Sequence, residues 1–236
     1  MRNWIRNTAT ALVVLASLCV VRVASMVYVD PGRTPLMYIR YWEGVGEGHI
    51  EHEWRDGADI SPNLLLAIVA AEDQKFFDHW GLDVGELQNA IETAGDGGKL
   101  RGASTLSQQT AKNVFLWPSR SYLRKGLELC FTLAVEVCWS KQRILEIYAN
   151  VAEFGPGVYG AEAAAQRYFH KAAIDLTPEE GALLAACLPN PLDRSPADPS
   201  ETVLNKQAWI LQQMQNLGGT AFIPAYERKD ADKDKG

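Results

Sequence analysis

Two adjacent acidic residues, Glu72 and Asp73, come directly after an almost wholly apolar stretch at residues 63–71. That stretch favours a buried helix, so the carboxyl groups stand at the edge of a core, where loss of water raises a carboxyl pKa. A carboxyl group with a raised pKa suits general acid or general base catalysis near neutral pH. The alternative is a helix end that turns into solvent, although a negative charge there opposes the helix dipole. These residues alone leave both interpretations open.

A second polar cluster occupies residues 102–113, where a glycine-led turn runs into a predicted helix with Ser104 or Thr105 at its start. Gln108 and Lys112 follow at spacings of three and four residues, so they can share one helix face with that hydroxyl group. Such a face offers hydroxyl, amide and ammonium donors together, which suits a phosphate or a sugar. An ordinary polar helix surface is the alternative.

Charged residues form two further clusters. Arg124, Lys125 and Glu128 lie three or four residues apart, so they share one flank of a helix. In one interpretation they form an exposed ion pair of roughly 0.3–0.5 kcal/mol. In the other, the cations hold a diphosphate while Glu128 orients them or binds a divalent metal. The fourth cluster, at residues 141–150, interleaves charges along an amphipathic helix pattern.

The elements that carry these clusters are predicted to be helices. Ser61 and Pro62 mark the start of the apolar helix, as N-cap and first helical residue. Alternating strand patterns are scarce, so the sequence predicts a single, mainly α-helical domain. Further helices are predicted at residues 83–94, 104–115, 121–138, 140–152, 158–170, 178–187 and 200–217.

Composition narrows the class of protein. The chain has 236 residues, of which 47% are hydrophobic, enough for one catalytic domain with an anchor. Its net charge of −6, with acids and bases interspersed, argues against nucleic acid as the main partner. The four cysteines show no CxxC spacing, so neither a zinc site nor a redox pair is indicated. His49 and His52 stand among glutamates and are interpreted as part of a solvated acidic segment.

The N-terminal segment predicts the compartment. Residues 8–29 carry a single charge, Arg22, and are long enough to cross a bilayer as a helix. Arg2 and Arg6 place residues 1–7 in the cytoplasm and the rest of the chain outside it. A cleaved signal peptide is the alternative to this transmembrane anchor. Residues 30–60 are predicted to be a juxtamembrane connector, residues 61–222 the catalytic domain and residues 223–236 a charged, disordered tail.

In order and spacing, the four clusters resemble signature motifs of the monofunctional biosynthetic peptidoglycan transglycosylases of glycosyltransferase family 51. They also resemble the glycosyltransferase domain of class A penicillin-binding proteins. The matching stretches are residues 72–81, 102–113, 124–128 and 141–150, and the resemblance runs from about residue 61 to 219. The chain has no room for a transpeptidase domain after residue 219, which indicates the monofunctional branch. The sequence departs from the family in two places. Ala149 replaces the usual leucine, and the fifth motif, normally rich in arginine, has no arginine at residues 203–207.

The resemblance implies a lysozyme-like helical domain that polymerises lipid II into β-1,4-linked glycan strands and releases undecaprenyl diphosphate. It implies Glu72 as the general base of an inverting displacement, and Glu128 as a second catalytic residue. It implies no obligatory cofactor, although Mg²⁺ or Mn²⁺ at Glu128 would suit oxygen ligands. The substrate-binding residues that it implies are Asp73, Phe76, His79, Ser104, Thr105, Gln108, Gln109, Lys112, Asn113, Arg124, Lys125, Lys141, Glu146 and Asn150.

The partners implied are lipid II, the lipid-linked glycan strand, the membrane, and other cell-wall synthases or divisome proteins. The implied place is the bacterial inner membrane, with one span and the catalytic domain on the periplasmic side, in cell-wall biogenesis and cell shape. Two alternatives stay open. A lytic or hydrolytic muramidase also uses a catalytic glutamate but needs no cationic diphosphate site. A non-catalytic cell-wall scaffold would be favoured by loss of Glu72 or Glu128, and both are present.

Overall fold

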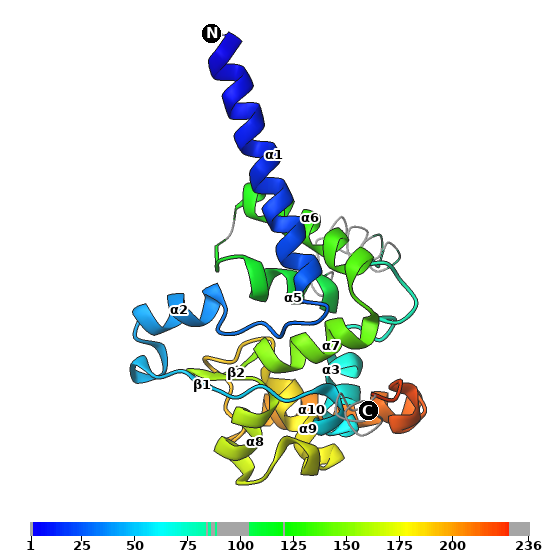
Figure 1. The fold of residues 1–236 in the computed structure, drawn as a ribbon. Coiled ribbons are helices and arrows are strands. Elements are labelled where there is room, and N and C mark those ends of the chain that lie inside the picture. Colours follow the sequence, from blue (N-terminus) through cyan, green and yellow to red (C-terminus); the bar gives the residue numbers. More distant parts are fainter. Residues whose placement is uncertain (1, 84, 86–87, 89–103, 120, 227–236) are drawn as a thin grey trace, which may run out of the picture.

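A buried helix, α3 (Pro62–Glu72), lies at the centre of the fold. The computed structural model describes residues 2–83, 85, 88, 104–119 and 121–226. As predicted, Ser61 caps α3 and Pro62 occupies its first turn, and the side chains at residues 64–70 are all buried. The helix packs against α9 (Pro178–Cys187) and α10 (Glu201–Asn216), which lie beside it in Figure 1.

Three consecutive helices form the other side of the domain: α5 (Leu106–Phe115), α6 (Tyr122–Cys138) and α7 (Lys141–Val151). Each begins at a hydroxyl N-cap, supplied by Thr105, Ser121 and Ser140, whose oxygens accept a hydrogen bond from a backbone N–H three residues on. Helix α5 packs against both α6 and α7. The predicted helices at 104–115, 121–138, 140–152, 178–187 and 200–217 are confirmed, and so is the mainly α-helical class.

A small sheet joins the two sides. Strand β1 (Glu51–His52) pairs in parallel with β3 (Val158–Tyr159), which pairs antiparallel with β2 (Glu153–Gly155). The helix predicted at 158–170 therefore starts late, as α8 (Ala161–Phe169). Gly160 makes the turn between strand and helix at φ +85, where a Cβ atom would lie 2.5 Å from the Asn150 carbonyl oxygen.

Residues 30–60 are not a simple connector, which corrects the sequence-based prediction. They form α2 (Pro35–Trp42), capped by Thr34, the short helices η1 (Val45–Gly48) and η2 (Gly57–Asp59), and strand β1. The His52 Nε2 atom lies 3.1 Å from the Asn150 carbonyl oxygen, so this ring nitrogen donates. The segment is part of the domain because β1 and its neighbours complete the sheet and contact α7.

The N-terminal helix α1 (Arg2–Ser25) extends from the body alongside α6 (Figure 1). Its C-terminal end is embedded: Val23 and Met26 are buried, and their carbonyl oxygens accept hydrogen bonds from Trp139 at 2.8 Å and Arg143 at 3.0 Å. Among the residues that the structure describes, no helix has the length and apolarity needed to cross a membrane. Several side chains of the predicted anchor at residues 8–29 lie outside that described part.

Two further predictions concern segments that are described only in part. The helix predicted at 83–94 lies mostly outside the described residues. Two short helices complete the described elements, η3 (Ala173–Asp175) and η4 (Gly219–Phe222). After η4, the chain continues to pack against the domain beyond the predicted boundary at 223. Ile223 is buried, and the Tyr226 hydroxyl donates to the Gln142 carbonyl at 2.9 Å. Residues 227–236 of the predicted tail lie outside the described part.

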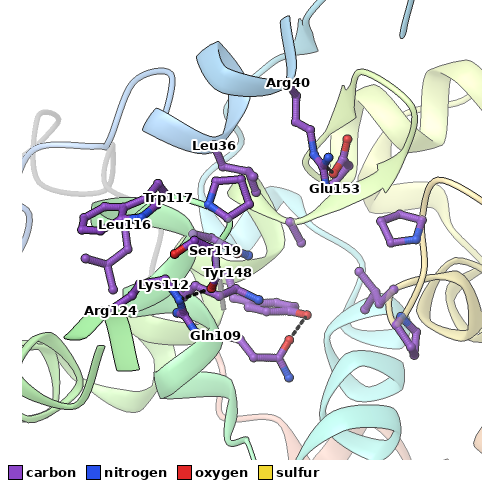
Figure 2. A pocket seen from close by; sticks show the side chains of 16 residues that line it. Leu36, Arg40, Gln109, Lys112, Leu116, Trp117, Ser119, Arg124, Tyr148 and Glu153 are labelled. Carbon is purple, nitrogen blue, oxygen red and sulfur yellow. Dashed lines mark hydrogen bonds and ion pairs between the residues drawn. The ribbon is translucent and has the colours of Figure 1, made fainter. Parts of the chain in front are cut away.

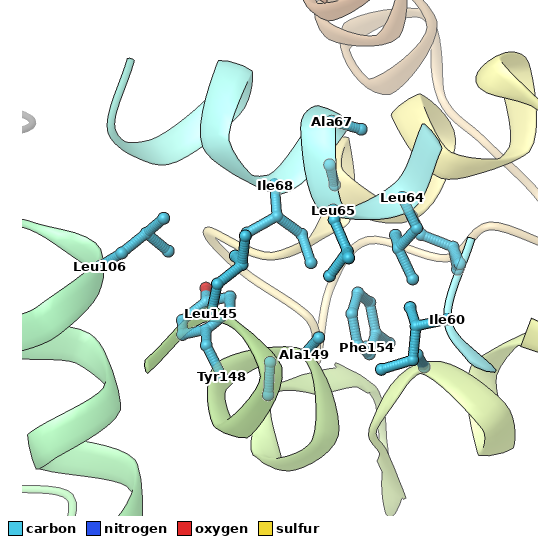
Figure 3. Close-up of a cluster of buried hydrophobic side chains, with 14 of the residues drawn as sticks. Ile60, Leu64, Leu65, Ala67, Ile68, Leu106, Leu145, Tyr148, Ala149 and Phe154 are labelled. Atoms are coloured by element: carbon cyan, nitrogen blue, oxygen red, sulfur yellow. The ribbon is translucent and has the colours of Figure 1, made fainter. Parts of the chain in front are cut away.

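One continuous core connects α3 with α7 and β2. Figure 3 shows Leu65 and Ile68 facing Leu145 and Phe154, all of them buried. Burial of each such side chain stabilises the fold by about 1.5–3 kcal/mol. Ala149, where the resembling family has leucine, is also fully buried, so the smaller side chain is a change inside the core. This core fixes the ends of α3 and α7 from which the polar side chains below project.

Candidate active site

An open cleft of about 550 Å³ lies between α2, α5, α7 and the segments that follow α5 and α9. Figure 2 shows Gln109, Lys112 and Tyr148 close together, with Arg40 and Glu153 as a separate pair. Of the residues predicted from sequence, this cleft is lined by Gln109, Lys112, Asn113 and Arg124.

Glu72 lies next to the cleft at the last turn of α3 and is half-buried. Its Oε2 atom accepts a hydrogen bond of 2.7 Å from the Gln109 side-chain amide. Burial raises the pKa of the Glu72 carboxyl, while the Gln109 hydrogen bond and the charges of Lys206 and Lys112 act against that rise. The raised pKa expected from the sequence is therefore confirmed, and its main cause is the apolar surroundings of α3.

Lys112 lies on α5 one turn beyond Gln109, where it lines the cleft. Burial lowers the pKa of its ammonium group, and the carboxylates of Glu128 and Glu72 raise it. Lys112 thus interacts electrostatically with both glutamates. A largely desolvated cation at this point is an attractive site for an anionic group of a ligand.

Glu128 is buried on α6 and contacts two cations. Its Oε2 atom lies 2.5 Å from Arg124 Nη1, and its Oε1 atom contacts Lys125 Nζ. Arg124 also donates from Nε to the Ser119 carbonyl, which turns the guanidinium towards the cleft lining. The sequence-based suggestion of Mg²⁺ or Mn²⁺ at Glu128 does not fit this arrangement, because each carboxylate oxygen is already paired with a cation. Glu128 instead orients Arg124 and Lys125.

Asp73, Phe76 and His79 were predicted to bind substrate, but the structure gives them other contacts. Asp73 accepts hydrogen bonds from His79 Nε2 and from the Leu106 backbone N–H, each at 3.0 Å. It therefore ties the end of α3 to the start of α5. Phe76 is fully buried under Lys141, whose Nζ lies 4.6 Å from the ring centroid. These three side chains hold the helices that frame the site.

Thr105 and Gln108, both predicted to bind substrate, form a capping box at the start of α5. Thr105 Oγ1 accepts from the Gln108 backbone N–H at 3.3 Å, and Gln108 Oε1 accepts from the Thr105 N–H at 3.0 Å. The Thr105 hydroxyl itself donates to the Gly81 carbonyl at 2.6 Å. Ser104 is exposed and does not line the cleft.

The predicted ligands of the fourth cluster, Lys141, Glu146 and Asn150 on α7, do not line the cleft. Lys141 pairs with Glu136 at 2.7 Å, and Glu146 pairs with Arg143 at 2.8 Å. The Asn150 side chain is fully buried and exchanges two hydrogen bonds of 2.8 Å with the backbone of Arg55. Lys141 and Asn150 thus connect α7 to neighbouring segments, whereas the Glu146 pair lies within α7.

One group of acidic residues has the spacing of a metal site. The carboxylates of Asp30, Asp56 and Glu146 lie within 4.8 Å of one another. The Arg143 guanidinium pairs with both Asp30 and Glu146, each at 2.8 Å, so a protein cation supplies the positive charge there.

Sequence reasoning missed two contributors to the site. Tyr148, in the cluster at 141–150, is buried and donates to Gln109 Oε1 at 3.1 Å. Lys206, in the stretch interpreted as a thin fifth motif, acts on Glu72 electrostatically from α10. The effect of Lys206 on Glu72 could be recognised only once α3 and α10 were known to pack together.

A helical domain in which a carboxyl group of raised pKa adjoins a cleft lined by cations has the features of an enzyme active site. The sequence model of the Transglycosylase family matches residues 43–215. The biosynthetic peptidoglycan transglycosylase of Salmonella enteritidis PT4 is 55% identical over 187 residues, covering 78% of this chain and 77% of that protein. The protein of the same name from Salmonella typhi is 54% identical over the same shares. The chain belongs to the transglycosylase family.

Proposed function

We propose that this protein is a peptidoglycan glycosyltransferase that joins lipid-linked disaccharide units into glycan strands. The observation that carries the proposal is the position of Glu72, one hydrogen bond from the lining of a cleft that also holds Lys112 and Arg124. Membership of the transglycosylase family and the names of the Salmonella relatives support the same activity.

In the proposed reaction Glu72 is the general base. It accepts the proton of the 4-hydroxyl group of one disaccharide unit as that oxygen attacks the anomeric carbon of the other. A new C–O bond forms, the bond from the anomeric carbon to the diphosphate breaks, and the anomeric centre is inverted to give a β-1,4 link. A carboxylate in apolar surroundings is a stronger base than one in water, which is what burial gives Glu72.

The leaving undecaprenyl diphosphate needs positive charge. Lys112 and Arg124 line the cleft, and Lys125 stands beside Arg124 on the same flank of α6. Their ammonium and guanidinium groups suit phosphate oxygens and would stabilise the charge that develops as the bond breaks. Glu128 holds Arg124 and Lys125 in place, so its role in this proposal is to position these cations.

We place the protein at the inner membrane, with α1 as an uncleaved anchor and the domain on the periplasmic side. The outer face of α6 next to α1 is apolar: Leu123, Leu133 and Val137 are 72%, 50% and 75% exposed. Exposed apolar side chains along one helix suit contact with lipid. The burial of Val23 and Met26 supports an uncleaved helix, because cleavage near residue 25 would remove Val23 from the core.

The test is incubation of the full-length, detergent-solubilised protein with labelled lipid-linked disaccharide-peptide, followed by gel separation. The wild type should form polymer and Glu72→Gln should not, while Glu201→Gln, at an exposed position on α10, should behave as the wild type. Cleavage of pre-formed glycan without polymer formation would identify a hydrolase instead. No reaction with either substrate would indicate a scaffold.

A further inference from the structure

Tyr148 links the core to the candidate general base through one intermediate. Its side chain is 2% exposed, and its hydroxyl group donates a hydrogen bond of 3.1 Å to Gln109 Oε1, drawn as a dashed line in Figure 2. Gln109 Nε2 in turn donates to Glu72 Oε2 at 2.7 Å. The three residues come from α7, α5 and α3, so their alignment depends on the packing of all three helices.

The chemistry of these groups allows only one orientation of Gln109 when Glu72 is ionised. An ionised carboxylate accepts hydrogen bonds and donates none, so Gln109 must turn its NH₂ group towards Glu72. The amide oxygen then faces Tyr148, which must donate. With Glu72 protonated, the opposite orientation becomes available, because the carboxylic acid can donate to a flipped amide oxygen. In that flipped orientation the Tyr148 hydroxyl would accept from the amide NH₂ group, and its own proton would lose the acceptor that Gln109 Oε1 provides, so Tyr148 favours the first orientation.

Tyr148 is suited to be a permanent donor. Burial, reinforced by the charge of Glu72, raises the pKa of its hydroxyl well above the ordinary value, so it keeps its proton throughout the neutral range. The charged groups that act on Glu72 are Asp73 at the end of α3, Lys112 on α5 and Lys206 on α10. Tyr148 therefore differs from these groups, because it acts on Glu72 chiefly through the Gln109 amide.

We propose that Tyr148 is a positioning residue that locks the Gln109 amide towards Glu72 and so keeps the Glu72 carboxylate ready to accept the proton of the acceptor hydroxyl. This inference rests on the proposed role of Glu72 as general base. It assigns no proton transfer to Tyr148 itself.

The test compares the pH dependence of polymerisation, as kcat/KM, for the full-length wild type and Tyr148→Phe. Loss of the lock permits the flipped amide, which favours protonated Glu72, so the acidic limb of the profile should move to higher pH by up to about one unit. At a pH on that limb the rate should fall by up to roughly tenfold, with recovery at higher pH. A uniform fall at every pH would indicate a structural role and would overturn the proposal, as would an unchanged profile.

Gln109→Ala provides an independent variant in case Tyr148→Phe folds poorly, because it removes the Gln109 hydrogen bond to Glu72 directly. It should shift the limb in the same direction, and adding Tyr148→Phe to it should give little further shift, since Tyr148 acts through Gln109. Additive shifts, or no shift in Gln109→Ala, would contradict the proposal.

The matched control is Tyr226→Phe, which removes the hydroxyl group of a half-buried tyrosine, bonded to the Gln142 carbonyl away from the cleft. It should leave the profile unchanged, and a shift equal to that of Tyr148→Phe would overturn the inference. Full activity of Glu72→Gln would instead refute the proposed base, which separates failure of the function from failure of this inference.

Discussion

Two buried or half-buried glutamates act electrostatically on Lys112, and their surroundings differ. Glu72 accepts its hydrogen bond from a neutral amide, and burial raises its pKa. Glu128 is held by a guanidinium and an ammonium group. Both oxygens of Glu128 are occupied by cations, whereas Glu72 is a desolvated carboxyl group with a neutral partner, which suits a proton acceptor. The same side chain is thus suited to proton transfer at one position and to organising charge at the other.

The largest expected difference between the two glutamates is in turnover. Glu72→Gln keeps the shape of the side chain and its contact with Gln109 but cannot accept a proton. We expect kcat to fall by about 10²–10⁴-fold, the range for loss of a general base. Single-turnover assays with labelled lipid-linked substrate would measure this fall, at concentrations that saturate both the wild type and the variant with substrate. A variant that retains more than about a tenth of the activity would argue against base catalysis by Glu72.

For stability, we expect the larger effect at Glu128 and the smaller one at Glu72. Glu128→Gln leaves Arg124 without its carboxylate in a largely buried setting, and breaking a buried pair by removing one partner costs about 3–5 kcal/mol. The measurement is the midpoint of thermal unfolding in detergent, which should fall clearly for Glu128→Gln and not for Glu72→Gln. Lys125→Ala is the milder comparison, because half of that side chain is exposed. Equal midpoints for Glu128→Gln and the wild type would remove the basis for the positioning role.

A third difference concerns pH and stability. A carboxyl group whose pKa is raised in the folded state binds its proton more tightly there, so Glu72 lowers stability as pH rises from about 4.3 to its folded-state pKa. Glu72→Gln removes this loss. The unfolding free energies of the two proteins should therefore be similar at low pH, and the variant should become the more stable one as pH rises. Parallel curves would contradict the raised pKa.

The smallest expected effect sharpens the electrostatic part of the comparison. Lys206 lowers the Glu72 pKa from α10, so Lys206→Ala should raise that pKa and move the acidic limb of activity to higher pH. The shift should be a few tenths of a unit, as for a partly screened charge. Lys171→Ala, which breaks an ion pair with Glu180 instead, serves as the control. Identical profiles for the wild type and Lys206→Ala would show that Lys206 has no influence on Glu72.

The sequence predicted the long helices well because their signals are local. Ser61 and Pro62 marked α3, and its apolar run predicted both its burial and the raised pKa of Glu72. The same kind of signal, Thr34 followed by Pro35, marks α2, but it lay in a segment interpreted as a connector. Strands β1 and β3 have two residues each, too short for periodicity, and they form only because segments a hundred residues apart pair.

The spacing of polar residues is ambiguous where one residue type serves two purposes. Thr105 and Gln108 were interpreted as ligand-binding donors, yet S/T-x-x-Q is also a capping signal, and the capping contacts are the ones found. Polar residues of α7 such as Asn150 were predicted to face substrate, but Asn150 bonds to the backbone of Arg55. Which polar groups remain directed at the cleft depends on the packing of the helices and cannot be obtained from spacing alone.

The embedded end of α1 has a mechanical consequence. A flexible linker between a membrane anchor and a domain would let the domain adopt many orientations relative to the anchor. Here the Val23 and Met26 carbonyls are bonded to Trp139 and Arg143, so α1 and the body form a stiff joint. With α1 in the bilayer, as we propose, the cleft would keep a fixed distance from the lipid plane and a fixed orientation relative to it. A growing strand would then leave along a constant direction relative to the membrane, and a change of direction would require rotation of the whole protein.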